Sequence, residues 1–457
     1  MTLPKARDDF KRVMMIAGSA LVAVGITAAL LAKAEPGSEG VALNIQAPRT
    51  LKRPPHANRL YGRVLTVTGR EYEGFIRWDQ NEGSWADILD ASKHVRSSRV
   101  ISVFGGEPEQ DDTREPGTRS IQFEGGRISI SGIRIALDEL NFGISTSALA
   151  GLRFGHIRSI EVLDDNSALF LLKSGAEVEL GADATDLGSN LRAVVVQDAS
   201  GGEIQFQWGD LDVVEFMAAP RGRRPSGERL FGTITTRTGL EFTGYVAWDV
   251  DEIYTTDQLD GEEDGRERKF PFGSITAIER YTSDGAYVRF VGGEEIILKG
   301  SNDVDESNRG ISISDVGLGQ VLVSWTDFES VRFHAADGDA GYDDFDGGHP
   351  IRGTVTTTSN ERFTGEIRWD ADEEFSWEML NGEHRDLAFQ IEFGLIASIT
   401  KGSFDGVIVE LLDGRSFDLT GSNDVDEGNK GIFVTDADGD QHAVDWKDFA
   451  SARFSNR

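Results

Sequence analysis

The feature that most constrains this chain is a long internal repeat. Residues 229–333 align with residues 350–454 at a constant offset of 121, without an insertion, and 42 of the 105 aligned positions are identical. A looser third copy begins at residue 59, at an offset of 170 from the copy that begins at 229. Repeats of this size predict that one structural unit recurs along the chain, so every motif has to be compared between copies.

A shorter period lies within the long one. Each half of a long repeat ends in the pattern aromatic-x-x-apolar-x-x-apolar, as in Trp325, Phe328 and Val331. Alternating residues such as Phe242, Gly244, Val246 and Trp248 predict short strands with one apolar face. The three-residue step of the closing triplet predicts a 3₁₀ turn before the last strand. Counting the triplets gives about seven units: 59–104, 118–162, 166–217, 229–279, 283–334, 350–400 and 404–455.

This combination of short strands and a closing 3₁₀ turn resembles the SH3-like and Sm-like small β-barrels. The resemblance implies an all-β chain of about seven tandem SH3-like units, and it implies no particular function. Linkers rich in Pro, Gly and charge separate the long repeats better than their halves, so we expect adjacent units to pack in pairs. An alternative joins two units into one ten-stranded sandwich or barrel. The predicted domains are 59–217, with an extra unit near 118–162, then 229–334 and 350–455.

The N-terminal segment carries a targeting signal. Basic residues between Lys5 and Arg12 precede an apolar run at 13–32, and Ala32-Lys33-Ala34 fits a cleavage site. Residues 1–34 are therefore predicted to be a signal peptide or a membrane anchor, followed by a linker at 35–58. In both cases the rest of the chain is exported to the periplasm, cell envelope or extracellular space. Contact with a membrane is expected only through residues 13–32, if they are not cleaved.

The charge balance limits the partners. The chain has 78 Asp and Glu against 46 Lys and Arg, which gives a formal net charge of -32, and it has no cysteine. Nucleic-acid binding requires a basic surface, so no nucleic-acid partner is expected. A basic protein segment is the partner that best complements such an acidic surface. Without cysteine, no disulfide can stabilise an exported fold.

An acidic loop recurs with unusual fidelity. The run GSNDVDE occupies residues 300–306 and again residues 421–427. Ca²⁺ is bound by six to eight oxygens, and Asp-x-Asp spacing on a turn rich in Gly and Asn can supply several of them. Two other interpretations stay open, namely a tight turn built from Asn, Asp and Gly, and a protein-docking face. The candidate metal ligands are Asp303, Asp305, Asn308, Asp424, Asp426 and Asn429.

The tryptophans and the missing catalytic motifs complete the prediction. Six tryptophans recur between repeats in phase with apolar residues, so they are expected in cores: Trp78, Trp208, Trp248, Trp325, Trp369 and Trp446. Trp85 and Trp377 fall outside this pattern and are expected to be exposed, with Trp377 beside Phe375 a contact point. The sequence has no cysteine nucleophile, no Gly-x-Ser-x-Gly elbow and no zinc-spaced histidine pair, so no enzyme activity is expected.

These observations predict an exported, non-catalytic binding or scaffold protein that uses repeated acidic loops and strand edges for protein interaction. The alternative is a calcium-stabilised envelope or extracellular module that faces glycans. A third hypothesis is a hydrolase that uses paired carboxylates. No catalytic residue and no cofactor-binding residue is assigned, and Ca²⁺ is the only cofactor considered.

Overall fold

The computed structural model describes residues 56–94, 119–123, 126–130, 147–181, 186–336, 340–402 and 405–455. The predicted signal or anchor at 1–34, including its apolar run, lies outside these residues, as does nearly all of the linker at 35–58. The described chain is all-β, as predicted, with short 3₁₀ helices between antiparallel strands. Within these residues, no helix is both long and apolar enough to cross a membrane.

The first long repeat contributes ten strands to one sheet. These strands are β1 (Tyr61–Thr66), β2 (Glu71–Trp78), β3 (Ile88–His94), β6 (Ser147–Arg153), β7 (Ile157–Asp164), β8 (Ser167–Leu172), β9 (Glu177–Gly181), β10 (Val194–Gln197), β11 (Glu203–Phe206) and β12 (Leu211–Phe216). Their order in the sheet is β11-β10-β2-β1-β12-β7-β8-β9-β3-β6. A separate two-stranded sheet consists of β4 (Arg119–Phe123) and β5 (Gly126–Ile130).

The second and third repeats contribute ten strands each. The second set comprises β13 (Phe231–Thr236), β14 (Glu241–Ala247), β15 (Gln258–Glu263), β16 (Arg266–Pro271), β17 (Ile275–Thr282), β18 (Gly285–Phe290), β19 (Glu295–Lys299), β20 (Ile311–Asp315), β21 (Gly319–Val323) and β22 (Phe328–Phe333). The third set comprises β23 (Arg352–Thr357), β24 (Arg362–Arg368), β25 (Met379–His384), β26 (Leu387–Glu392), β27 (Ile396–Lys401), β28 (Gly406–Leu411), β29 (Ser416–Thr420), β30 (Ile432–Thr435), β31 (Gln441–Val444) and β32 (Phe449–Phe454).

The two halves of each repeat exchange strands. In the second set, β13 and β14 from the first half join β20, β21 and β22 from the second half, in the order β22-β13-β14-β20-β21. The remaining strands follow the order β17-β18-β19-β15-β16, and β17 pairs with β22. The hydrogen-bonded unit is therefore the ten-stranded long repeat, and each five-strand group mixes both halves.

The predicted extra unit near 118–162 is distributed differently. Its residues supply the β4–β5 sheet and then β6 and β7, which take the positions of β16 and β17 in the second set. In the described part of the chain, the ten-stranded sets therefore contain six five-strand groups, whereas the triplet count predicted seven units. The triplet at 154–160 ends the first half of the first repeat. An insertion after β3 separates this end from the strands that begin the same half.

The triplet that begins at Trp325 forms a turn that is not a 3₁₀ helix, and the triplet of the unit 59–104 lies outside the described residues. The other five closing triplets begin with 3₁₀ turns, as predicted. These turns are η2 (Phe154–His156), η4 (Trp208–Asp210), η5 (Phe272–Ser274), η7 (Phe393–Leu395) and η8 (Trp446–Asp448), while η3 (Gly188–Asn190) and η6 (Tyr342–Asp344) lie elsewhere. At each of these five triplets the first aromatic residue begins the turn and is buried, which anchors the turn in the core.

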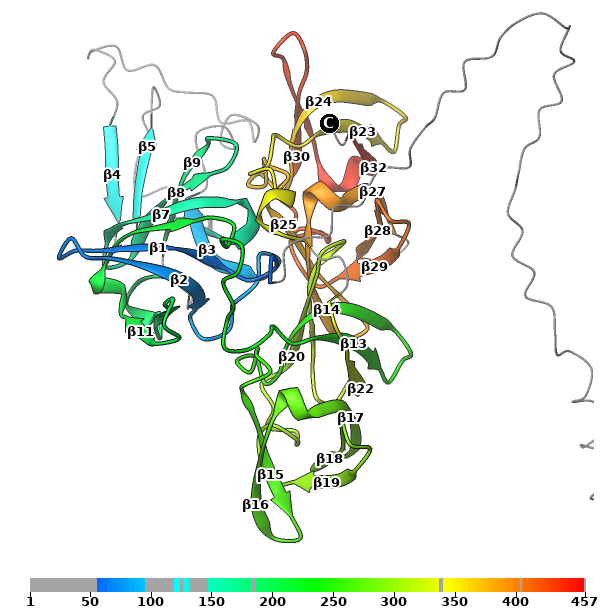
Figure 1. The fold of residues 1–457 in the computed structure, drawn as a ribbon. Coiled ribbons are helices and arrows are strands. Elements are labelled where there is room, and N and C mark those ends of the chain that lie inside the picture. Colours follow the sequence, from blue (N-terminus) through cyan, green and yellow to red (C-terminus); the bar gives the residue numbers. More distant parts are fainter. Residues whose placement is uncertain are drawn as a thin grey trace, which may run out of the picture. The chain divides into compact units, whose positions relative to one another are not determined.

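One strand pair joins the second and third sets. Strand β21 pairs with β26, with Val321 opposite Phe389, and this pairing makes one sheet of twenty strands (Figure 1, green to red). The hydrophobic core is continuous across the joint, because Phe242 packs against Phe389 with their ring centroids 5.8 Å apart. The first set has its own core.

The prediction that Trp85 and Trp377 would be exposed is wrong. Both are buried, with exposed fractions of 0% and 1%, and both belong to the core of the first set. Trp85 packs against Tyr342, and Trp377 stacks on Phe375. Both contacts involve residues outside the periodic strands, so the strand pattern gave no sign of them. The six recurring tryptophans are buried, as predicted.

Candidate functional site

The acidic residues cluster in two loop types that recur in each repeat. We call residues 79–82, 249–252 and 370–373 the A-loops, and residues 183–186, 303–306 and 424–427 the B-loops, of which 183–185 lie outside the described residues. Each A-loop follows a buried tryptophan at the end of a strand, and its first two residues have positive φ angles. For Asp249 and Val250 these angles are 47° and 60°. This strained turn aims the aspartate inward.

A basic side chain of the same repeat neutralises the first aspartate of every A-loop. The Arg309 amide donates to Asp249 Oδ1 (2.5 Å), and its guanidinium Nη2 donates to Oδ2 (2.8 Å). Arg192 binds Asp79 in the first repeat (3.1 Å), and Lys430 Nζ lies 3.5 Å from Asp370 in the third. The three cations occupy equivalent positions after the B-loops.

The first aspartate of each B-loop accepts hydrogen bonds from two other parts of its repeat, the tryptophan before the A-loop and a strand amide. Asp303 accepts from Trp248 Nε1 on its carbonyl (2.8 Å) and from the Asp260 amide on its carboxylate (2.6 Å). Asp424 makes the same pair of bonds with Trp369 (2.7 Å) and the Asn381 amide (2.6 Å). The equivalent bonds in the first repeat run from Trp78 and Asp90 to Asp186. Burial raises the pKa of Asp303 to about 6 and that of Asp424 to about 7.

The other residues of the GSNDVDE run also have structural partners. Ser301 Oγ donates to the carbonyl of Asp260 (2.7 Å), and Asn302 Nδ2 donates to Asp249 (2.5 Å). Val304 is fully buried in the core, whereas Glu306 faces solvent. The repeat of this run is therefore accounted for by a shared hydrogen-bond network that connects the B-loop, the A-loop and strand β15 or β25.

The six predicted metal ligands bond to separate groups. Asp305 accepts the Ser307 amide (2.8 Å), and Asp426 accepts the Gly428 amide (2.8 Å), so each closes its own turn. Asn308 Oδ1 and Asn429 Oδ1 each accept the amide two residues later, at 2.9 Å. Asp303 and Asp424 bond to strand amides, as described above. Calcium binding by these six residues stays a prediction.

A different carboxylate group comes together in the second repeat. Asp249, Asp251 and Glu252 each offer an oxygen within 4.8 Å of the others, which makes them the one such set among the described residues. Arg309 already binds both Asp249 and Asp251, and Arg192 of the first repeat lies 3.3 Å from Asp251. These guanidinium groups supply the positive charge that a cation would otherwise bring.

The last residue of each A-loop is a glutamate that the sequence analysis missed. Glu82 and Glu373 are buried, and in all three copies, including Glu252, one buried carboxyl oxygen lacks a hydrogen-bond partner. Burial, reinforced by neighbouring carboxylates, raises the pKa of Glu252 to about 9 and raises those of the other two as well. Glu252 therefore holds a proton at neutral pH. The recurrence of these glutamates four residues after each loop's tryptophan was the available signal.

A further carboxylate after each A-loop receives a basic side chain from another repeat. Asp87, Asp257 and Glu378 occupy equivalent positions, and each accepts two backbone amides of its own loop. Asp87 binds Arg229 of the second repeat in two bonds, of 3.1 and 3.2 Å. In the same way, Asp257 binds Arg77 of the first repeat, and Glu378 binds Lys93 of the first repeat.

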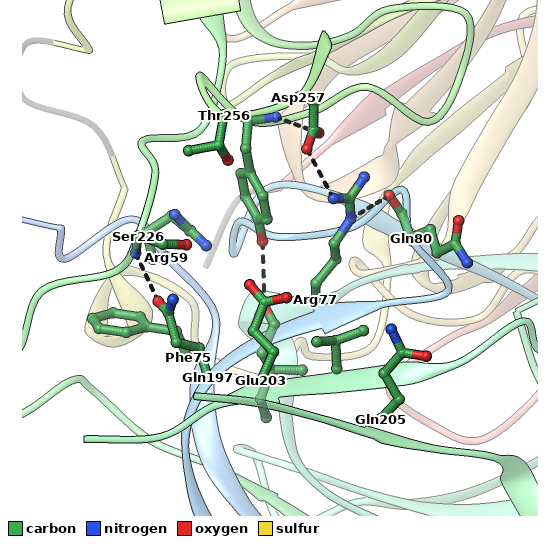
Figure 2. Close-up of a pocket in the computed structure, with 13 residues that line it drawn as sticks. Arg59, Phe75, Arg77, Gln80, Gln197, Glu203, Gln205, Ser226, Thr256 and Asp257 are labelled. Carbon is green, nitrogen blue, oxygen red and sulfur yellow. Dashed lines mark hydrogen bonds and ion pairs between the residues drawn. The ribbon is translucent and has the colours of Figure 1, made fainter. Parts of the chain in front are cut away.

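A polar pocket of about 380 Å³ that opens to solvent lies at the contact between the first and second repeats. Figure 2 shows Arg77 between Asp257 (3.1 Å) and the carbonyl of Gln80 (2.7 Å). The Arg59 guanidinium lies over the Tyr254 ring, 3.9 Å from its centroid. Strands β2, β10 and β11 contribute further polar side chains to the wall, including Gln197, Glu203 and Gln205. The arrangement offers many hydrogen-bonding groups between two repeats.

The first and third repeats meet through buried ion pairs. Arg153 Nε lies 3.0 Å from Glu392, and His156 Nε2 lies 3.4 Å from the same carboxylate. Burial acts to raise the pKa of Glu392, but the charges of Arg153 and His156 outweigh it and lower that pKa. Lys93 inserts next to Glu378 and donates to the carbonyl of Asp372. The acidic loops of both later repeats therefore hold basic side chains of the first.

No known protein family, curated protein or solved structure matches this chain.

Proposed function

We propose that the chain is an exported, non-catalytic binding or scaffold protein whose acidic loops receive basic segments of a partner protein. One observation carries this proposal. At Asp87, Asp257 and Glu378 the same loop position holds a basic side chain from another repeat, so the fold already uses this position as a receptor for cations. A partner would bind in the same way at acidic loop residues that the chain leaves exposed.

The B-loops supply those residues. Glu306 and Glu427 are exposed, and Asp305 and Asp426 are half-buried beside them. The loops recur at an offset of 121, so one partner with two basic segments gains affinity by binding both. The five-strand groups, together with the 3₁₀ turns that precede β7, β12, β17, β27 and β32, support the proposal that the scaffold consists of exchanged SH3-like units. Export rests on the predicted targeting signal at residues 1–34.

A defined basic probe tests the B-loops. We expect a labelled nona-arginine peptide to bind the full chain at low salt, and to bind the variant Asp305→Asn, Glu306→Gln, Asp426→Asn, Glu427→Gln at least about fivefold more weakly. A matched control removes four exposed charges elsewhere, through Glu161→Gln, Asp165→Asn, Glu177→Gln and Glu179→Gln. Equal losses in both variants would show that only net charge matters, which contradicts the proposal.

Calcium binding is the second candidate, favoured by the convergence of Asp249, Asp251 and Glu252. A ligand that binds only the folded state raises the midpoint of thermal unfolding. The candidate requires a higher midpoint in millimolar Ca²⁺ than in EDTA or Mg²⁺, and loss of that difference in Asp249→Asn. An equal midpoint in all three conditions would remove this candidate. The carboxylate hydrolase stays a third hypothesis.

A further inference from the structure

The segment 340–348, between the second and third repeats, docks on the first repeat. The Phe345 ring covers Gly155, where a Cβ atom would lie 2.2 Å from it, and Tyr342 packs against Trp85 with ring centroids 4.7 Å apart. Lys173 Nζ lies 3.3 Å from the centroid of the Tyr342 ring. The docking surface on the first repeat consists of Gly155, in the 3₁₀ turn η2, and Lys173, the first residue of the following hairpin turn. We call this surface, and its equivalents in the other repeats, the shoulder.

Polar bonds fix this segment to the first shoulder. Lys173 Nζ donates to the carbonyl of Phe345 (3.3 Å), and Ser174 Oγ donates to that of Gly347 (2.8 Å). The Gly347 amide donates to His156 Nδ1 (3.1 Å). The segment presents two aromatic rings three residues apart, because Tyr342 begins the 3₁₀ helix η6 and Phe345 directly follows its last residue.

The second and third repeats have the same shoulder. The Lys173 amide donates to the carbonyl of His156 (3.0 Å), and the equivalent bonds run from Val291 to Ser274 and from Leu412 to Leu395, both 2.9 Å. The equivalents of Gly155 are also glycines, Gly273 and Gly394. Backbone position and glycine are therefore shared by all three shoulders.

The exposure of the three shoulders differs. Val291 is 71% exposed and Leu412 is 52% exposed, which places them among the most exposed large apolar residues of the described chain. Gly273 is exposed and Gly394 is half-buried, whereas Gly155 is buried beneath Phe345. In the second and third repeats an apolar side chain is thus exposed to solvent, at the position equivalent to the one where the first repeat binds an aromatic segment.

We propose that the shoulders of the second and third repeats each bind a partner-protein segment that carries two aromatic side chains three residues apart. One ring would cover Gly273 or Gly394, as Phe345 covers Gly155. The other would pack on Val291 or Leu412, which replace the cation of Lys173 with an apolar contact. This interaction is independent of the acidic loops and of the function proposed for them.

The segment that the first shoulder holds defines the chemistry of the partner. The interface at Gly155 and Lys173 shows which chemistry this backbone arrangement recognises. The other linker between repeats, 218–228, contains no aromatic residue, and the segment 340–348 is itself occupied on the first shoulder. The occupant of the other two shoulders is therefore assigned to a different protein.

A peptide with the sequence of residues 340–348 is the probe. We expect the labelled peptide to bind the full chain with a Kd below about 1 mM and a stoichiometry of two, measured by fluorescence anisotropy. The double variant Val291→Asp, Leu412→Asp should bind at least about tenfold more weakly. A peptide with alanine in place of both aromatic residues should not bind.

Leu163→Asp is the matched control, because Leu163 is another exposed leucine, 46% exposed, near the end of strand β7 and outside the shoulders. This variant should bind the peptide as the unchanged chain does. Absence of binding up to about 1 mM would overturn the proposal. So would equal binding by the double shoulder variant, since the peptide would then occupy another surface, such as the first shoulder.

Discussion

At the scale of single residues, the aspartate at the start of each B-loop is a structural centre. Asp303 is buried, accepts from Trp248 and from a strand amide, and sits beside the A-loop carboxylates. Buried polar groups are costly unless they are hydrogen-bonded, so a residue that satisfies a strand amide holds the surrounding elements in register.

Removing this side chain should destabilise the chain. Asp303→Ala leaves the Asp260 amide without its acceptor, and we expect a loss of about 1–3 kcal/mol in the free energy of unfolding. Asp303→Asn keeps an acceptor oxygen and should cost less. Glu306→Ala, at an exposed position of the same loop, should change stability by less than about 0.5 kcal/mol. Denaturant unfolding of the three variants measures this, and equal losses would contradict the assigned role.

The raised pKa values predict the pH dependence of stability. Burial, aided by the charges of Asp251 and Asp303, raises the pKa of Glu252 from 4.5 to about 9, and burial raises that of Asp424 from 3.8 to about 7. At a pH between 4.5 and about 9 for Glu252, and between 3.8 and about 7 for Asp424, the folded state binds more protons than the unfolded state. The stabilisation is therefore full below about pH 4 and is lost as the pH rises through the folded values.

We thus expect a higher midpoint of thermal unfolding at pH 5 than at pH 8. The double variant Glu252→Gln, Asp424→Asn cannot ionise at these positions, so its difference between the two pH values should be smaller. A midpoint that increases from pH 5 to pH 8 would show that other titrating groups dominate.

At the scale of strands, the repeated glycines mark close crossings of the two halves. A Cβ atom on Gly365 would lie 2.0 Å from the carbonyl oxygen of Thr435 in β30, and one on Gly244 would lie 2.3 Å from that of Ser314 in β20. Strand β24 pairs with β30, and β14 with β20, so these glycines stand where a strand of one half meets a strand of the other.

Gly365→Ala should therefore disrupt the β24–β30 pairing. The added methyl group clashes with backbone, which cannot move as a flexible side chain would, and we expect a loss of at least about 1–3 kcal/mol in stability. Gly209→Ala is the control, because a Cβ atom there would meet nothing within 4 Å. Hydrogen exchange of the β30 amides gives the local readout, and unchanged exchange in Gly365→Ala would refute the close crossing.

The strand pattern predicted these elements well, for a physical reason. Apolar alternation from Phe242 to Trp248 reflects burial of one face, which every copy of the strand shares, so it can be seen in the sequence. The exchange of strands between halves leaves no such trace, because each strand needs only some antiparallel neighbour. The buried Trp377 and the pairing of Lys93 with Glu378 were equally hidden, since both arise between repeats.

At the scale of the whole molecule, acidic loops hold the basic side chains of other repeats. The chain carries a formal charge of -32, yet several of its arginines and lysines form ion pairs between repeats. Burying an ion pair costs desolvation free energy, and removing one of its partners leaves the other charge buried and uncompensated. The loop position that forms these pairs is the same in all three repeats, which is the basis of the proposed receptor role.

The pair formed by Arg229 and Asp87 tests this central claim most directly, because their side chains are only 1% and 4% exposed. The measurement is a double-mutant cycle on the full chain, with Arg229→Met, Asp87→Asn and the combination, read from the free energy of unfolding. We predict a coupling energy of about 2 kcal/mol or more between the two residues. Effects that add to within about 0.5 kcal/mol would mean that the loop does not bind the cation, and would contradict the account.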